Sequence, residues 1–354
     1  MTEWLIAGVN NLLHNCAKIQ SGERLLLVGE SGPNPFYEPG LCDSVARVIR
    51  HQNIDVRVIH AIPGKGADDF PERVLEAMQK ADVTIFFSRL GDQVRFVESA
   101  GPGRKVMAYT LTKAHLTSPF ATTDFDLMSE VEKELISMIR RAQSYRISHS
   151  NGTDLYAEMT QNFDMNGEES SSDSIIKFSV QLFPVVIFPP IELHHLNGTL
   201  VLEHFLTSSS TRAYENSVLM LDSPVRVDVE DSIMTEFKGN AAVVSEVRNQ
   251  LEQSAAITGG NPYQLNSWHT GINPHTFFKG NPFDDLERWG TVTFGSPRYT
   301  HIHAAGHDPG DCAIQLFDCD IWFDDQQIWD SGRMIFADKW YGKTEVGDIG
   351  ISYF

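Results

Sequence analysis

Glu23-Arg-Leu-Leu-Leu-Val-Gly29 is the stretch that decides the fold, because a short apolar run ending at glycine is typical of a buried strand in a parallel sheet. Outward from it, predicted helices and strands alternate. Helices are expected at Leu41–His51, Pro71–Ala81 and Ser129–Gln143, and strands at Val56–Ala61, Val83–Phe87 and Lys105–Tyr109. Ser129 followed by Glu132 has the pattern of a helix-capping box. This alternation predicts a doubly wound, Rossmann-like α/β layer over residues 1–150.

From residue 151 the sequence becomes rich in strand patterns. Strands are expected at Ile175–Phe183 and Gly198–Phe205, a hairpin from Val225–Asp228 and Ile233–Phe237, and a helix at Ala241–Gln253. Short strands and loops that contain His, Gly and Pro follow. The predicted fold class is therefore α/β plus α+β, with the Rossmann-like domain at 1–150 and an α+β domain carrying the candidate ligand or metal site at 151–354.

Charge and hydropathy narrow the functional classes. The chain has 354 residues with 28 Lys and Arg against 47 Asp and Glu, a formal net charge of −19. Nucleic acid and anionic membrane surfaces are therefore not expected as partners, because both require basic protein surface. The first residues lack the pattern of a signal peptide and no apolar run is long enough to cross a bilayer, so we expect a cytoplasmic protein. Its four cysteines are expected to be reduced thiols, with Cys312 and Cys319 in the core.

Histidine is the residue type that points to chemistry. The densest segment is Thr300–Asp311, and if its start is extended, His301 and His303 point to one side. His307 and Asp311 follow across a Gly/Pro turn that could fold them back. Imidazoles with a carboxylate hold iron(II) or catalytic zinc. The alternative is a solvated loop whose histidines only form hydrogen bonds.

A second histidine group lies at Glu192-Leu-His-His195, with Glu203-His204 one strand later. Alternation places Glu192 and His194 on one face and His195 on the other. Metal binding or general-base catalysis is possible here. A polar strand edge is the expected interpretation.

Several short motifs occur in an order typical of one known group. They are Gly152-Thr-Asp-Leu155, Asn197-Gly-Thr-Leu-Val201, Gly271-Ile-Asn-Pro274, Gly290-Thr-Val292 and a terminal hairpin at Cys319-Asp-Ile-Trp-Phe-Asp-Asp325. On these motifs the chain resembles the thermophilic aminopeptidases (aminopeptidase T type) and their relatives, the 2,5-dihydroxypyridine 5,6-dioxygenases. The resemblance covers most of the chain. It implies a Rossmann-like first domain, a metal site in an α+β second domain, and a homodimer.

The family's ligand positions are mostly not ligands here. The resemblance places them on Ser267, Asp311, Ala313, Thr293 in a strand that starts at Gly290, and among Val185 and Val186. Of these only Asp311 can coordinate a metal, and His269 is the nearest candidate to Ser267. A two-metal aminopeptidase needs nearly all of these ligands, so peptidase activity is not expected.

Two functions of different classes follow. In the first, a peptide-binding protein with a degenerate metal site presents a peptide or peptide-derived substrate in a biosynthetic pathway, with contacts expected from Trp268, His269, Asn273 and Tyr299. In the second, a site rebuilt around one non-haem iron or zinc ion gives an oxygenase-like or hydrolytic enzyme acting on a peptide-derived or aromatic small molecule. The candidate ligands are His269, His301, His303, His307 and Asp311. Because the family's metal ligands are missing, the peptide-binding function is slightly favoured over the metalloenzyme. Whether the chain is an enzyme stays open.

Overall fold

The chain divides into two compact units that interleave along the sequence. The computed structural model describes residues 2–64, 69–94, 97, 100–159, 180–209, 217–307 and 310–351. The first unit comprises Met1–Glu130, Ile176–Val186 and His275–Thr293, and the second comprises Val131–Ile175, Ile187–Pro274 and Phe294–Phe354. The domains 1–150 and 151–354 stay a prediction from the sequence.

The first unit contains a five-stranded sheet in the order β2-β1-β3-β4-β7, with every neighbouring pair parallel. Its strands are β1 (Leu25–Glu30), β2 (Val56–Ala61), β3 (Val83–Phe87), β4 (Arg104–Ala108) and β7 (Gln181–Phe183). The strands predicted at residues 56–61 and 83–87 are confirmed, with the same first and last residues. The apolar run of β1 is buried. Only the end of the strand predicted at 175–183 lies within the described residues. The finer expectation of a Rossmann-like layer stays a prediction.

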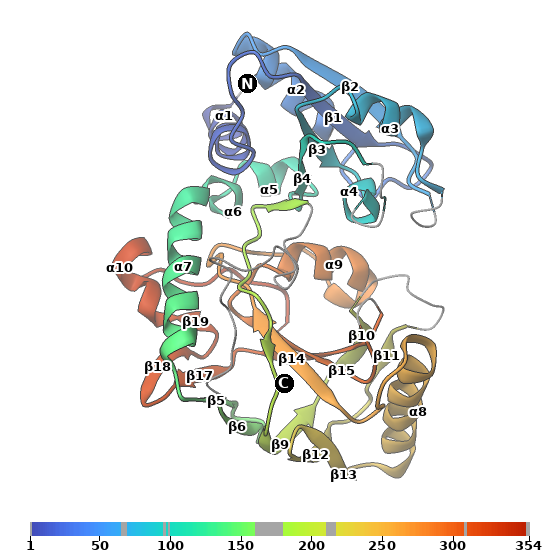
Figure 1. The fold of residues 1–354 in the computed structure, drawn as a ribbon, viewed down its shortest axis with the longest axis vertical. Helices are drawn as coiled ribbons and strands as arrows, with labels where there is room; N and C mark the ends of the chain where they lie inside the picture. The colour runs from blue at the N-terminus through green and yellow to red at the C-terminus, as the bar shows by residue number, and fades with distance from the viewer. Residues whose placement is uncertain are drawn as a thin grey trace. The chain divides into compact units, whose positions relative to one another are not determined.

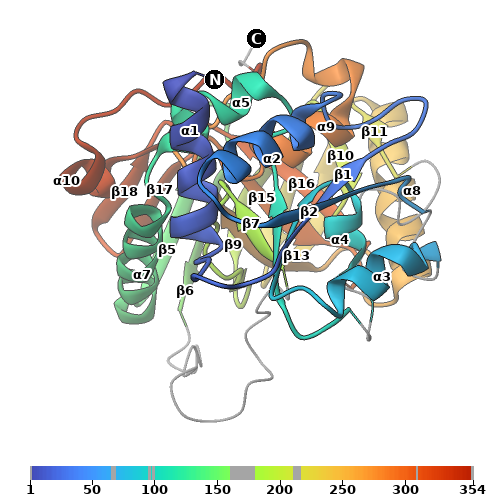
Figure 2. The ribbon, with the colours of Figure 1, turned by 90° about the horizontal axis from the view of Figure 1, so that it is seen from above.

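Helices follow the strands of this sheet as the alternation predicted. The short helices and turns of the unit are α1 (Glu3–Asn10), η1 (Asn11–Cys16), α2 (Leu41–His51), α3 (Glu72–Met78), α4 (Leu90–Gln93), α5 (Lys113–Leu116), α6 (Pro119–Thr122), η4 (Pro282–Asp284) and α9 (Leu286–Thr293). α2 buries Val45 and Ile49 and packs against β1 and β2, with α1 at its side (Figures 1 and 2). Gly290 was expected to begin a strand, and this expectation is wrong because Leu286–Thr293 is helical.

The second unit contains an eight-stranded sheet in the order β13-β12-β9-β6-β5-β17-β18-β19. Its strands are β5 (Ser144–Ser148), β6 (Asp154–Glu158), β9 (Asn197–Leu202), β12 (Val225–Glu230), β13 (Ile233–Lys238), β17 (Asp320–Phe323), β18 (Gln326–Asp330) and β19 (Arg333–Met334). Both predicted hairpins are confirmed, β12 with β13 and β17 with β18. The strand predicted at 198–205 is two strands, because His204 has a positive φ of 63° and ends the extended run before β10 (Phe205–Ser208).

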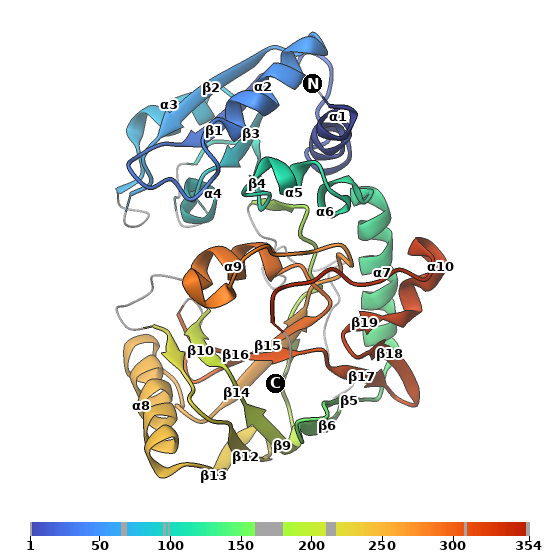
Figure 3. The same ribbon diagram turned by 180° about the vertical axis from the view of Figure 1, so that it is seen from behind.

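A six-stranded sheet in the same unit positions the candidate site, in the order β11-β10-β16-β15-β14-β8 (Figure 3). Its further strands are β8 (Ile191–Glu192), β11 (Leu219–Met220), β14 (Leu265–Thr270), β15 (Tyr299–Ala304) and β16 (Cys312–Phe317). One face is apolar: Trp268, Ile302 and Ile314 are fully buried, and the indole of Trp268 lies 5.6 Å from the ring of Phe188. This face forms a core beneath the strands.

Of the two long helices, α7 begins before the predicted Ser129, whereas α8 begins at Ala241 as predicted and ends after the predicted Gln253. α7 spans Phe125–Arg141, and the Asp124 carboxylate accepts hydrogen bonds from the backbone N–H of Asp126 and Leu127. The capping box expected at Ser129 is therefore wrong; its hydroxyl donates to the Phe125 carbonyl inside the helix. α8 spans Ala241–Thr258, and η5 (Ile335–Ala337) and α10 (Asp338–Tyr341) follow β19. None of the helices in the described part of the chain is long and apolar enough to cross a membrane.

Candidate metal centre

Three imidazoles converge on one face of the six-stranded sheet. β15 is extended, so His301 and His303 point to the same side, as the spacing predicted. β14 pairs with β15 in a register that sets His269 directly opposite His301. Trp268 points to the other face, opposite Ile302. Strand period and register together place His269, His301 and His303 side by side.

The geometry of this His triad suits one metal ion. One nitrogen from each ring lies within 4.8 Å of the other two, and the Nε2 atoms of His269 and His303 are 3.1 Å apart. Two nitrogens bound to one ion at 2.0–2.1 Å in tetrahedral geometry are separated by about 3.3 Å. Within the described ranges, this is the one group of three or more metal-ligating side chains that comes together in this way.

Two imidazoles of the triad, His269 and His301, are buried and neutral. His269 and His301 are each 3% exposed, and burial lowers the pKa of both well below its usual range, with the neighbouring imidazoles adding to the effect. Neutral imidazole is the form that binds metals. The Nδ1 of His269 and both ring nitrogens of His301 have no hydrogen-bond partner among the residues that are described. Buried polar atoms without partners are costly unless something binds them.

Asp311 contacts the triad through the Nδ1 of His303. Its carboxylate lies 3.0 Å from the Nδ1 of His303, and it accepts a hydrogen bond from the Ser209 hydroxyl. Asp311 is 1% exposed, so solvent does not screen the pair. An Nδ1–H donated to this carboxylate leaves the Nε2 lone pair of His303 facing His269. Asp311 thus holds His303 in the orientation that a ligand needs.

Aromatic rings border the triad. The ring of half-buried Phe294 lies 5.5 Å from His269 and 5.0 Å from His301, and Tyr299 lies 5.1 Å from His301. His303 is the most exposed ligand, with 16% of its side chain accessible. An incoming molecule would therefore approach beside His303 and meet aromatic surface.

Of the other residues expected at the site, Tyr299 borders the triad, whereas His307 and Trp268 do not join it. His307 is exposed, and its backbone N–H donates to the hydroxyl of Thr258 at the end of α8. Trp268 and Asn273 are fully buried, and Tyr299 is 7% exposed with its ring stacked on Phe317. The structure therefore joins His269, His301 and His303, adds Asp311 through His303, and leaves His307 outside.

Two of the positions that the resemblance assigned to family ligands lie beside His303. Ser267 on β14 and Ala313 on β16 are the two direct cross-strand neighbours of His303. Thr293 lies at the end of α9, where its hydroxyl donates to the Trp289 carbonyl. On β14 and β16, the residues directly opposite His303 are therefore a serine and an alanine, which are not the expected ligands. The triad lies next to these positions but is made of different residues.

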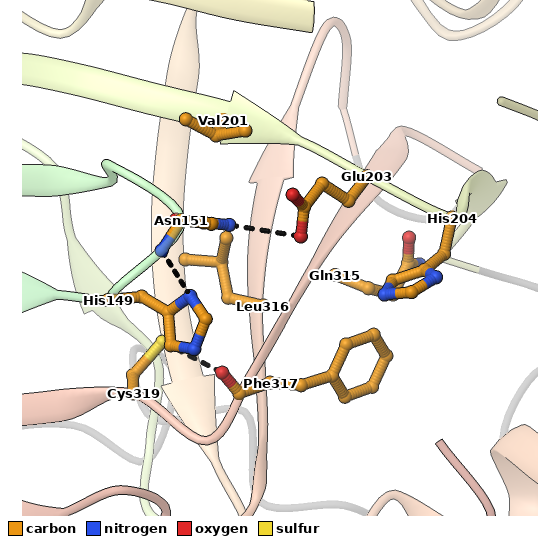
Figure 4. Close-up of a pocket in the computed structure, with 9 residues that line it drawn as sticks. All are labelled: His149, Asn151, Val201, Glu203, His204, Gln315, Leu316, Phe317 and Cys319. Atoms are coloured by element: carbon orange, nitrogen blue, oxygen red, sulfur yellow. Dashed lines mark hydrogen bonds between the residues drawn. The ribbon is translucent and has the colours of Figure 1, made fainter. Parts of the chain in front are cut away.

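The second histidine group forms surface pairs and one narrow pocket. His194 pairs with Glu192 at 3.1 Å and His195 with Asp231 at 2.6 Å, all exposed, as expected for a polar edge. The pocket is lined by His149, Asn151, Val201, Glu203, His204, Gln315, Leu316, Phe317 and Cys319 (Figure 4). In it the Asn151 amide donates to Glu203, and Gln315 lies opposite His301 on β16. The four cysteines of the chain are free, as expected; Cys312 and Cys319 are buried as predicted, and the other two are buried as well.

Solved structures share this architecture at low sequence identity. Over 93% of this chain and 96% of the other, the fold matches 2,5-dihydroxypyridine dioxygenase from Pseudomonas putida KT2440 with a TM-score of 0.54 and 12% identity. The chain shares the fold of this dioxygenase. AmpT from Thermus thermophilus aligns over 94% of this chain and 99% of its own, with a TM-score of 0.48 and 11% identity. No family model and no curated protein matches the sequence. The fold expected from the motifs is thus confirmed as a distant relationship.

Proposed function

We propose that the chain is a mononuclear metalloenzyme whose His269, His301 and His303 hold one iron or zinc ion. The observation that carries this proposal is the meeting of three imidazoles on one sheet face, with His269 and His301 buried and neutral. Three protein ligands that leave positions open are typical of catalytic metals, whereas structural zinc is closed by four. The fold shared with a dioxygenase makes iron the first metal to test.

The donor set fits such an ion. Imidazole nitrogen suits both zinc and iron(II), and one of the two unpartnered ring nitrogens of His301 gains a bond on ligation. When bound, the ion would act as a Lewis acid at its open positions or, as iron, supply redox chemistry. The protein's own contribution is to exclude water with Phe294 and Tyr299 and to fix the ligand His303 through Asp311.

The same face offers a group for orienting a substrate. Gln315 is 3% exposed, its amide N–H donates to Thr207, and its Oε1 has no partner within the described part of the chain. Gln315 lies opposite His301, so this acceptor is part of the triad's surroundings. Aromatic rings with one buried acceptor support an aromatic or peptide-derived small molecule that carries an N–H or O–H group.

Peptide presentation without chemistry is the second proposal, and fewer observations support it. Its expected contacts include Trp268, which is fully buried in the core of its unit, and Asn273, which is also buried. Cytoplasmic location, a homodimer and a role in biosynthesis accompany either proposal as expectations. The intact triad is the feature that separates the two functions.

Metal analysis tests the proposal directly. Protein purified without chelator or His-tag, in air and anaerobically, is expected to contain about one iron or zinc ion per chain by inductively coupled plasma mass spectrometry. His269→Ala and His301→Ala should each abolish this content. His195→Ala is the control, because it removes an exposed imidazole that pairs with Asp231 and does not belong to the triad.

The metal contents of the parent and the variants decide whether the triad holds a metal ion. Loss of metal in the triad variants, with content retained in the His195 control and in a Trp268→Phe variant, supports the proposal. Substoichiometric metal in the parent protein after reconstitution with iron(II) and zinc, or equal content in the triad variants, contradicts it. Circular dichroism of each variant establishes that the fold is retained.

A further inference from the structure

The narrow pocket of Figure 4 lies beside the metal centre on the same sheet. Its wall includes Phe317, whose ring stacks on Tyr299 at 5.5 Å, and the Tyr299 ring lies 5.1 Å from His301. Gln315, another residue of the wall, is the direct cross-strand neighbour of His301. Neighbouring strands are about 4.8 Å apart, so a small molecule that contacts the triad can also reach the pocket.

The wall of the pocket carries an unused hydrogen-bond acceptor. Gln315 is 3% exposed, and its amide N–H donates to the Thr207 hydroxyl at 2.8 Å. This bond fixes the amide, whose Oε1 has no hydrogen-bond partner among the residues that the structure describes. A buried carbonyl oxygen without a donor is costly, so a ligand that donates a hydrogen bond to it would be stabilised.

A carboxylate without a balancing cation lines the same pocket. Glu203 follows β9 and is half-buried, and its carboxylate accepts a hydrogen bond from the Asn151 amide at 3.1 Å (Figure 4). Within the described part of the chain, the pocket is lined by no lysine or arginine. The wall therefore offers two acceptors, the Glu203 carboxylate and the Gln315 Oε1, and one of them is an anion.

The other titratable groups of the pocket supply no positive charge. The Nδ1 of His149 accepts the backbone N–H of Asn151 at 3.1 Å, so this nitrogen carries no proton. Burial lowers the pKa of His204, although the charge of Glu203 opposes the shift, and the imidazole is therefore neutral at pH 7. Burial also raises the pKa of the Cys319 thiol, which stays uncharged. The pocket thus has a negative charge that no group of its wall balances.

We propose that this pocket binds the protonated amine of a small molecule, and that this molecule is the substrate of the metal centre. An ammonium group supplies the missing positive charge and has N–H donors for both Glu203 and the Oε1 of Gln315. Because the pocket is narrow, it takes the amine end, and the rest of the molecule lies toward the aromatic rings that border the triad. The assignment as substrate rests on the proposed function, whereas amine binding by itself does not.

Benzylamine is the probe for the amine site, because at pH 7 it is a cation with an aromatic ring. The full chain is freed of metal with chelator and titrated with benzylamine, and binding is followed by saturation-transfer difference NMR. We expect saturable binding, and at least about tenfold weaker binding of benzyl alcohol, which has the same ring but no charge. Glu203→Gln and Gln315→Leu should each weaken benzylamine binding by a similar factor. Glu192→Gln, at an exposed glutamate of β8, is the matched control and should bind as the parent does.

Cobalt(II) added to the chelated protein tests whether the amine lies beside the triad. Bound benzylamine should show faster proton relaxation near this paramagnetic ion, and Glu203→Gln should remove the effect together with binding. No saturable binding, equal affinity for benzyl alcohol, or unchanged affinity in both pocket variants would overturn the amine site. Binding without faster relaxation, or faster relaxation that persists in Glu203→Gln, would overturn its link to the metal centre. Failure of cobalt to bind would contradict the proposed function and that link, whereas the titration of the metal-free protein decides the amine site on its own.

Discussion

Replacing Asp311 with asparagine isolates what the carboxylate behind His303 contributes to metal binding. The substitution keeps the size of the side chain and an acceptor oxygen, but it removes the negative charge 3.0 Å from the His303 Nδ1. Asp311 is 1% exposed, so water does not compensate for the lost charge. Loss of such an outer carboxylate typically lowers metal affinity 10- to 100-fold, about 1.4–2.7 kcal/mol.

Competition with a chromophoric chelator measures the affinity for zinc, and thermal unfolding with excess zinc gives an independent value. Asp231→Asn is the matched control, because Asp231 pairs with His195 in the same way on the exposed surface. It should leave zinc affinity unchanged. If Asp311→Asn binds zinc within threefold of the parent while His301→Ala does not bind it, the carboxylate does not orient His303, and that part of the argument is refuted.

Three further predictions concern activity and stability. Aminoacyl-p-nitroanilides should not be cleaved even with added zinc or cobalt, because one triad cannot hold two metals; metal-dependent turnover that Asp311→Ala abolishes would contradict this. Burial raises the pKa of Glu132 to about 7, so the unfolded carboxyl releases its proton first and stability falls by up to about 3 kcal/mol as pH rises from about 4.5 to 7. Urea unfolding at several pH values should show this slope in the parent and its loss in Glu132→Gln. Asp124→Ala should cost about 1 kcal/mol by removing the cap of α7, whereas Ser129→Ala should cost under about 0.5 kcal/mol.

The parallel sheet was predictable because its strands carry local signals. The apolar runs at Leu25–Glu30 and Val83–Phe87 need no partner to be recognised as buried strands. α9 was not predictable in this way. Its β-branched Thr291 and Thr293 favour a strand, yet in the structure their hydroxyls donate to carbonyls four residues earlier in the helix.

Half of the candidate site was predictable for a similar reason. A period of two places His301 and His303 on one face wherever the strand is extended. The contact of His269 with His301 depends on a pairing between residues over thirty apart in sequence, which no local pattern encodes. His307 does not fold back, because Ala305 and Gly306 both have positive φ, 56° and 126°, and direct the chain toward Thr258.

The two faces of β14 explain how the protein holds the imidazoles together although their unpartnered nitrogens lower its stability. Trp268 and His269 are neighbours in sequence, yet Trp268 packs on Phe188 and Tyr145 while His269 meets two other imidazoles. A slip of one residue would exchange these faces, so burial of Trp268 fixes the register that assembles the triad. The unpartnered nitrogens cost stability, and the aromatic core beneath them offsets that cost. A core that holds three imidazoles together on one face is what a preorganised metal site requires, since the ion then binds without reordering the chain.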